Sequence, residues 1–192
     1  RLAEAAARAR ERGIEVIDFG TGDPREPTDP KIRQALVDGL RDRMGYPAAA
    51  GLPELRAAVA GWAERRFGAR LDPDAQIVPT LGSKEAIFTF ALTTVDVDGG
   101  KDTVAYTDPG YPVYERGAQF AHARTLALPL LEDNDFLPDL DAVDDWSRIA
   151  VLWVNYPNNP TAAVAPPAFY ERVAELAREH GFVLASDEAY TE

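Results

Sequence analysis

The sequence contains no cysteine and only two histidines, His122 and His180, among its 192 residues. Without cysteine there is no disulfide framework, thiolate nucleophile or thiolate metal site. Two histidines leave little for an imidazole metal site or a Ser-His catalytic triad. Any chemistry that this chain carries must therefore use carboxylates, phenols, amides, the backbone or a cofactor.

Positive charge is also scarce. Lys and Arg total 20 against 32 Asp and Glu, which gives a formal net charge of −12. A field of that sign repels nucleic-acid phosphates and anionic lipid headgroups, so we expect no nucleic-acid partner and no membrane partner. No apolar run approaches the roughly 20 residues that cross a bilayer, and the start of the chain lacks a signal-peptide core. We expect a cytoplasmic, globular protein.

Short apolar strands alternate with helices over most of the chain, which predicts a mainly parallel sheet covered on both faces. The apolar runs at 151–154 and 182–185 are continuous, as strands buried on both faces require. The expected strands are 15–19, 76–79, 103–106, 125–128, 149–155 and 182–186. The expected helices are 2–12, 31–43, 52–67, 83–93, 112–120 and 166–180. The acidic stretch 132–135 lacks the glycine and glutamate of a calcium hand, and we interpret it as a solvated turn.

Polar residues follow the expected strands at their carboxyl ends, where ligands bind in open α/β sheets. A glycine turn before Ser83 and Lys84 opens a helix whose free N–H groups form a phosphate cradle in principle; a turn with a serine cap is the alternative. Tyr111 follows the next strand on a Pro-Gly turn, where it either stacks on a planar ligand or covers a helix end.

The last two strands end in amides, an acid and a phenol. The loop at 155–161 has three asparagines and two prolines, and the prolines fix the backbone so that a side chain such as Asn159 can be aimed. Asp187 leaves a buried strand three residues before Tyr190, and a buried carboxylate needs a cation or hydrogen-bond donors. A structural Arg partner or a helix cap is the alternative for Asp187.

These residues, in this chain order, resemble the fold-type I pyridoxal-phosphate aminotransferases over essentially the whole chain. The motifs at 18–24, 80–88, 109–114 and 155–161 look most like the succinyldiaminopimelate aminotransferases of lysine biosynthesis. The resemblance implies a three-layer α/β/α architecture, with an incomplete pyridoxal-phosphate-binding large domain over 46–192. It also implies an N-terminal arm and part of the small domain over 1–45, with pyridoxal 5'-phosphate as cofactor.

The resemblance also implies roles around the cofactor ring. Asp187 would pair with the protonated pyridine nitrogen, which keeps the ring able to accept electrons. Asn159 and Tyr190 would hydrogen-bond the phenolic oxygen of the ring, and Tyr111 would stack on its face. Asp187 and Tyr190 are thus the expected catalytic residues of this chain.

Further implied contacts involve the cofactor phosphate, the substrate and a second subunit. Ser83 and Lys84 would meet the phosphate through the helix N-terminus, and Gly22 would let the backbone approach the substrate carboxylate. Tyr46 would reach the phosphate of the cofactor in a neighbouring subunit, which implies a homodimer.

The chain departs from the family pattern in two ways. Ala162 stands where the family has glycine, and a positive φ there would cost an alanine about 1 kcal/mol. The lysine that forms the Schiff base, and the arginines for phosphate and substrate carboxylate, follow this region in the family. Lys31, Lys84 and Lys101 do not match that lysine, so we expect an N-terminal portion that is inactive alone.

The implied reaction is transamination between amino and oxo acids, with N-succinyl-2-amino-6-oxoheptanedioate as substrate and glutamate as amino donor. Another fold-type I specificity (aspartate, alanine or LL-diaminopimelate transamination, or carbon–sulfur lysis) would share every residue named. A non-catalytic regulator with a pyridoxal-phosphate-binding domain is a second alternative, but the chain has no basic helix-turn-helix. A Rossmann dinucleotide site is disfavoured because Gly82 lacks the companion glycines.

Overall fold

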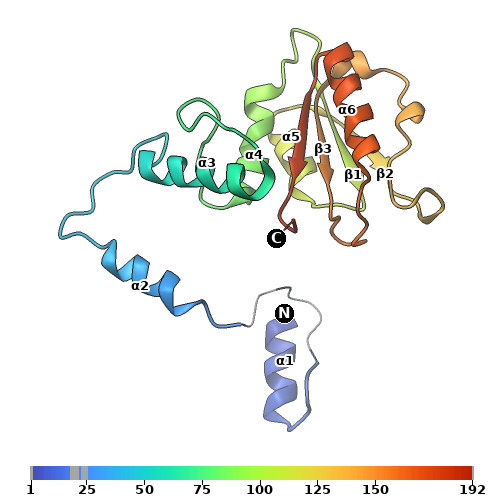
Figure 1. Ribbon diagram of the computed structural model, residues 1–192. Coiled ribbons are helices and arrows are strands. Elements are labelled where there is room, and N and C mark those ends of the chain that lie inside the picture. Colours follow the sequence, from blue (N-terminus) through green and yellow to red (C-terminus); the bar gives the residue numbers. More distant parts are fainter. Residues whose placement is uncertain (1, 18–21, 23–25, 192) are drawn as a thin grey trace. The chain divides into compact units, whose positions relative to one another are not determined.

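The computed structural model describes residues 2–17, 22 and 26–191. The chain divides into two units, Arg1–Pro47 and Ala48–Glu192. The first contains helices α1 (Leu2–Glu11) and α2 (Pro30–Asp38), neither of which buries a residue. The second contains a sheet and the remaining helices (Figure 1). Among the described residues, the buried hydrophobic core therefore belongs to the second unit.

Helix α2 starts as the sequence predicts but ends early. The Asp29 carboxylate accepts a hydrogen bond from the N–H of Lys31 at 2.7 Å, and Pro30 takes the first helical position. Both features are typical of helix starts. The expected end at residue 43 is wrong, because Gly39 caps the helix and donates its N–H to the carbonyl of Ala35. Residues 15–17 form no strand, and residues 18 and 19 of that expected strand lie outside the described residues.

The second unit is built on a four-stranded sheet in the order β2-β1-β3-β4. Its strands are β1 (Thr103–Asp108), β2 (Arg124–Pro129), β3 (Ile149–Asn155) and β4 (Val183–Asp187). All three pairings between these strands are parallel, so their carboxyl ends meet at one edge of the sheet. This confirms the parallel α/β fold expected from the alternating pattern.

Helices cover both faces of this sheet. The unit contains α3 (Pro53–Phe67), α4 (Ser83–Thr94), α5 (Val113–Phe120) and α6 (Pro167–His180), with 3-10 turns η1 (Glu132–Asn134), η2 (Leu140–Ala142) and η3 (Trp146–Arg148). One apolar cluster joins α4 and α5 to Val104 and Val151 of the sheet. A second cluster joins α6 to Ala105 and Leu152, the next residues along the same strands. Because neighbouring residues of a strand point to opposite faces, the architecture is α/β/α.

The strand expected at 76–79 is wrong. Residues 77–80 are irregular, and Val78 is 72% exposed. A strand needs a neighbour for its backbone hydrogen bonds, and none of the described strands pairs with this segment. The apolar pattern alone could not reveal that missing neighbour.

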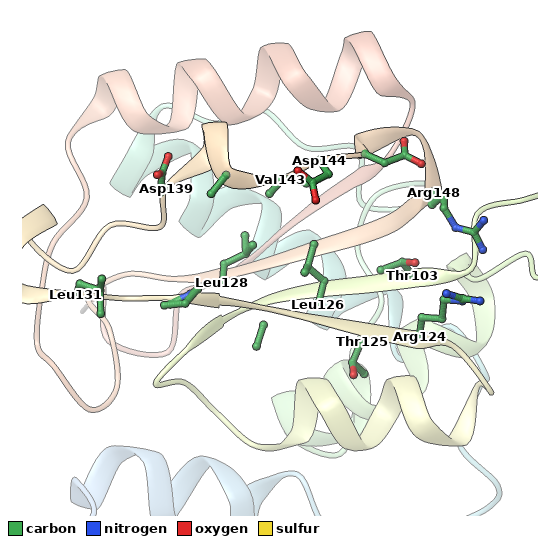
Figure 2. A pocket seen from close by; sticks show the side chains of 14 residues that line it. Thr103, Arg124, Thr125, Leu126, Leu128, Leu131, Asp139, Val143, Asp144 and Arg148 are labelled. Atoms are coloured by element: carbon green, nitrogen blue, oxygen red, sulfur yellow. The ribbon is translucent and has the colours of Figure 1, made fainter.

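An ion-pair cluster ties three strands together at the amino edge of the sheet. Arg148 donates to both carboxylate oxygens of Asp102, and the Nε of Arg124 lies 3.5 Å from Oδ2 of the same carboxylate. Burial would raise the pKa of Asp102. Hydrogen bonds from Arg148 and Thr103, with the charges of both arginines, together hold that pKa below its ordinary value. Figure 2 shows Arg124 and Arg148 at the same end of a pocket along β2.

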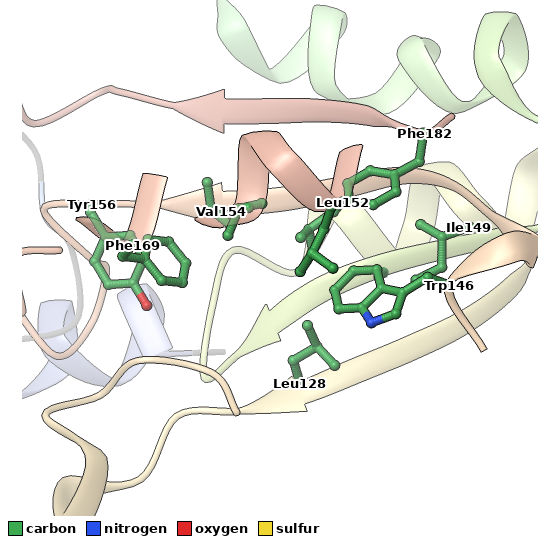
Figure 3. Close-up of a cluster of buried hydrophobic side chains, with 11 residues drawn as sticks. Leu128, Trp146, Ile149, Leu152, Val154, Tyr156, Phe169 and Phe182 are labelled. Atoms are coloured by element: carbon green, nitrogen blue, oxygen red, sulfur yellow. The ribbon is translucent and has the colours of Figure 1, made fainter. Parts of the chain in front are cut away.

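The cluster on the α6 side is rich in aromatic rings (Figure 3). Trp146 stacks on Phe182 with ring centroids 5.3 Å apart, and Tyr156 meets Phe169 edge to face at 5.6 Å. These rings fill the space between β3 and α6, which fixes the helix against the centre of the sheet. In the described ranges, no helix combines the length and the apolar character that crossing a membrane requires.

We predict that Gly117→Ala destabilises the fold although alanine is the better helix former. A Cβ at residue 117 would lie 2.7 Å from the backbone oxygen of Phe88, where α5 packs closely on α4. We expect a loss of about 1–3 kcal/mol in the free energy of unfolding, measured by urea titration. The matched control is Gly61→Ala in α3, where a Cβ meets only the end of the flexible Arg65 side chain. That control should gain up to about 1 kcal/mol, and equal effects would contradict the packing argument.

Candidate functional site

A pocket of about 190 Å³ lies at the carboxyl edge of the sheet. It is lined by Ser83, Tyr111, Asn155, Asn159, Asp187, Ala189 and Tyr190. These residues come from the start of α4, from the segment after β1, and from the last residues of β3 and β4 with the segments that follow them. Parallel pairing brings such segments together, which is why ligands bind at this edge in open α/β sheets.

Asp187 is held from two sides. Its Oδ2 accepts a hydrogen bond of 2.7 Å from the phenol of Tyr114, and its backbone carbonyl accepts one of 2.8 Å from the Nδ2 of Asn155. Neither alternative suggested by the sequence, an Arg partner or a helix cap, accounts for this carboxylate among the described contacts. The acid is instead fixed by neutral donors.

Tyr114 is the donor in this pair. Its side chain is 1% exposed, and burial raises the pKa of its phenol well above the ordinary value, with a further contribution from the hydrogen bond to Asp187. The raised pKa favours the protonated phenol, which is the form that donates to Asp187.

The asparagine-rich loop after β3 is tied to itself and to β4. The Oδ1 of Asn155 accepts from the N–H of Asn159 at 2.8 Å, while the Nδ2 of the same side chain bonds β4. The Oδ1 of Asn158 accepts from both the N–H and the hydroxyl of Thr161. These side-chain bonds replace a regular turn and fix where Asn159 meets the pocket.

The N-cap residue of α4 has no side chain, and the Glu85 carboxylate accepts a hydrogen bond of 2.7 Å from the N–H of Leu81, just before the cap. Gly82 is the N-cap residue, with φ of 83°, and no side-chain hydrogen bond caps the helix. The serine-cap alternative is therefore wrong, since Ser83 is the first helical residue and lines the pocket. An uncapped helix start presents free N–H groups and the positive end of the helix dipole, which favours an anion.

Five of the eight residues singled out in the sequence, Ser83, Tyr111, Asn159, Asp187 and Tyr190, line this one pocket. The Lys84 side chain lines a separate pocket of about 460 Å³ with Leu81, Glu85 and Phe88. Gly22 and Tyr46 belong to the first unit and are exposed. The roles expected for all eight residues remain predictions, including those of the five that the pocket brings together.

Sequence reasoning missed Asn155 and Tyr114. Asn155 ends an otherwise apolar strand, and a polar residue at the end of a buried strand is a signal that could have singled it out. Tyr114 stands three residues after Tyr111 near the start of a helix, a spacing that places both rings on the same side. No pattern in the sequence indicates that the Tyr114 phenol reaches Asp187, 73 residues further along the chain.

A larger pocket, of about 820 Å³, runs along β2 (Figure 2). Its two arginines, Arg124 and Arg148, are already paired with Asp102, and none of the residues predicted for the site lines it. Size alone therefore does not identify the functional pocket. The smaller one has the convergent acid, amides and phenols.

Fold and site together define a parallel α/β protein. Its pocket lies at the carboxyl ends of the strands and is lined by an acid, amides and phenols. Residues 14–192 match the profile of the family described as aminotransferase class I and II. The chain belongs to this family, whose members depend on pyridoxal phosphate.

The relatives agree with this assignment. The chain is 43% identical over 194 residues to an LL-diaminopimelate aminotransferase of Nitratidesulfovibrio vulgaris, covering 99% of this chain and 48% of that protein. A solved probable N-succinyldiaminopimelate aminotransferase from Thermus thermophilus is 36% identical with a TM-score of 0.86, covering 98% and 51% of the two chains. Aspartate aminotransferase from Thermus thermophilus with maleate is 32% identical with a TM-score of 0.83, covering 98% and 49%. The chain spans about half the length of the curated relatives it matches.

We predict that Ala162→Gly stabilises the protein. Ala162 has φ of 60°, its N–H donates to the carbonyl of Asn158 at 2.8 Å, and its side chain is exposed. A left-handed conformation costs alanine about 1 kcal/mol that glycine does not lose. Urea titration should show a gain of that order. Ala168→Gly, at an exposed position in α6 without positive φ, should lose up to about 1 kcal/mol. A loss in both variants would contradict the strain at residue 162.

Proposed function

We propose that this chain supplies the cofactor ring site of a pyridoxal-phosphate-dependent aminotransferase in diaminopimelate and lysine biosynthesis. The observation that carries the proposal is the convergence of Ser83, Tyr111, Asn159, Asp187 and Tyr190 on one pocket. Family membership supports the same cofactor. We also propose that residues 46–192 are part of the cofactor-binding large domain and that 1–45 are an arm and part of the small domain. The unit boundary between Pro47 and Ala48 supports this division.

The residues in the pocket fit the chemistry of this cofactor. A carboxylate at Asp187 suits a cationic ring nitrogen, and the uncapped start of α4 at Gly82 suits a phosphate. Tyr111 offers an aromatic face, while Asn159 and Tyr190 offer hydrogen-bond donors for a ring oxygen. The site thus combines a carboxylate for the ring nitrogen, a helix start for the phosphate and an aromatic side chain for the face of the ring.

Bound pyridoxal phosphate supplies a cationic ring that takes up the electron pair released when the substrate loses its Cα proton. For that chemistry Asp187 would keep the proton on the ring nitrogen, because a carboxylate favours the cationic form of its partner. Asn159 and Tyr190 would hold the ring oxygen in one orientation. Tyr111 would exclude water from one face of the ring.

Some parts of the site would come from outside the pocket described above. No lysine is among the residues that line it, so the amine that carries the cofactor would be supplied from elsewhere in the protein. We propose that Gly22 admits the substrate carboxylate and that Tyr46, whose side chain is fully exposed, serves the cofactor of a second subunit in a homodimer. A monomeric mass by light scattering would contradict that assembly.

For the substrate we propose LL-diaminopimelate, with 2-oxoglutarate and glutamate as the exchanging oxo and amino acids. Curated LL-diaminopimelate aminotransferases are 40–43% identical over nearly the whole chain. A second candidate is N-succinyl-2-amino-6-oxoheptanedioate with glutamate. It is supported by the motifs at 80–88 and 155–161 and by the Thermus thermophilus neighbour at 36% identity.

We predict that Asp187→Ala weakens pyridoxal phosphate binding by about tenfold or more, because hydrogen bonds to charged groups contribute about 1.5–3 kcal/mol. Titration of tryptophan fluorescence gives the dissociation constant. The control is Asp144→Ala, which removes the same charge from the separate pocket along β2. Equal loss in both variants would indicate a general charge effect rather than a ring contact.

We predict that the protein containing this chain transaminates LL-diaminopimelate with 2-oxoglutarate, with kcat/KM at least about tenfold above that for N-succinyl-LL-diaminopimelate, the amino form of the second candidate, which also forms glutamate from 2-oxoglutarate. One extra acyl group must be accommodated by pocket shape, and such differences are typically worth a factor of ten or more. Coupled detection of glutamate gives both values. The reverse order would select the second candidate, and activity with neither would contradict the proposed pathway.

A further inference from the structure

Tyr114 lies behind the pocket rather than in its wall. It belongs to the first turn of α5, its side chain is buried, and it is absent from the residues that line the pocket. Its phenol nevertheless donates to Asp187 at 2.7 Å across the interface between α5 and β4. The residue thus touches the acid of the site without touching the space in which a ligand binds.

The Tyr114 ring is fixed by its neighbours. It stacks on Trp153 of β3 with ring centroids 5.1 Å apart and an interplanar angle of 13°. Trp153 in turn meets Phe90 of α4 edge to face at 5.7 Å. At Gly117, α5 packs directly on the backbone of α4, where a Cβ would lie 2.7 Å from the oxygen of Phe88. The phenol oxygen is therefore held at one position relative to the sheet.

The same ring also contacts the residue expected to stack on the cofactor. Tyr111 and Tyr114 meet edge to face, with centroids 6.0 Å apart and planes at 82°. Aromatic pairs favour this geometry. One buried side chain therefore contacts both the anionic partner and the stacking surface of the pocket.

We propose that Tyr114 is a positioning residue: its phenol fixes the Asp187 carboxylate by Oδ2, and its ring edge supports Tyr111, so that acid and ring meet the cofactor in one arrangement. This inference rests on the proposed function. Among the described residues, no second hydrogen-bond donor contacts that carboxylate, so Oδ1 remains available to a cationic ring nitrogen.

A neutral donor suits this task better than a basic side chain. A lysine or arginine at this position would neutralise the carboxylate and compete with the ring cation for it. The phenol orders the carboxylate and leaves its negative charge in place. Burial raises the pKa of the Tyr114 phenol, which favours the protonated form that donates this hydrogen bond.

The test compares pyridoxal 5'-phosphate with 1-deazapyridoxal 5'-phosphate, in which C–H replaces the ring nitrogen. The ratio of the two dissociation constants reports the contact between Asp187 and that nitrogen, because all other contacts are shared. In the unaltered protein we expect the natural cofactor to bind about tenfold more tightly than the analogue. Fluorescence titration of the full protein, without substrate, gives both constants.

Tyr114→Phe keeps the ring and its stack on Trp153 but removes the donor. We expect the ratio to fall by about threefold or more, since the carboxylate is no longer held. The matched control is Tyr156→Phe, which also removes a buried phenol hydrogen bond, to the carbonyl of Phe136, but on the other side of the sheet. Melting temperatures check that both variants fold, and the control should keep the ratio of the unaltered protein.

A double-mutant cycle completes the test. In an Asp187→Ala background the ratio should already be close to one, and adding Tyr114→Phe should not change it further. If Tyr114→Phe weakens binding of both ligands equally, its role is merely structural and the proposal is overturned. If the unaltered protein binds neither ligand or does not distinguish them, the proposed function fails, which is a different outcome.

Discussion

Parallel pairing of β3 with β4 sets Asn155 opposite Asp187 at the end of the ladder, and the whole pocket depends on that register. A shift of one residue would turn Asp187 to the α6 face and remove it from Tyr114. The six residues of β3 before Asn155 are apolar and buried, so sliding β3 along β4 would carry the polar Asn155 into the apolar core. The polar end of each strand is therefore placed by the apolar residues that precede it.

Each edge of the sheet holds a carboxylate, and the groups that bind it differ between the two edges. At the amino edge, Asp102 is surrounded by Arg148 and Arg124, so the carboxylate is neutralised and serves to join strands. At the carboxyl edge, the donors to Asp187 among the described residues are neutral: the Tyr114 phenol bonds its carboxylate and the Asn155 amide bonds its backbone carbonyl. A carboxylate that is ordered but not neutralised can still attract a cation, which distinguishes a ligand site from a structural ion pair.

Elements that depend on a local residue pattern were predicted correctly from the sequence. An element that needs a neighbouring strand as its hydrogen-bond partner was not. The run 149–155 was predicted with the bounds it has, because seven consecutive buried positions leave little ambiguity. Residues 76–79 contain only two apolar residues, Ile77 and Val78, and have no neighbouring strand in the described chain, and they do not form a strand. Helix α2 stopped at Asp38 because Gly39 follows it, a signal that was present in the sequence and was outweighed by apolar spacing.

The sequence by itself determined the chemistry of this protein: no thiols, few imidazoles, and an acid, amides and phenols at the ends of apolar strands. The sequence also has Ala162 at a position where the family has glycine. The φ of 60° at this residue explains why alanine is strained there. Only the tertiary structure decided which groups meet. Tyr114 reaches Asp187 from another element, and the Lys84 side chain turns to a different pocket. Such contacts depend on packing between distant segments, which no local pattern of residues encodes.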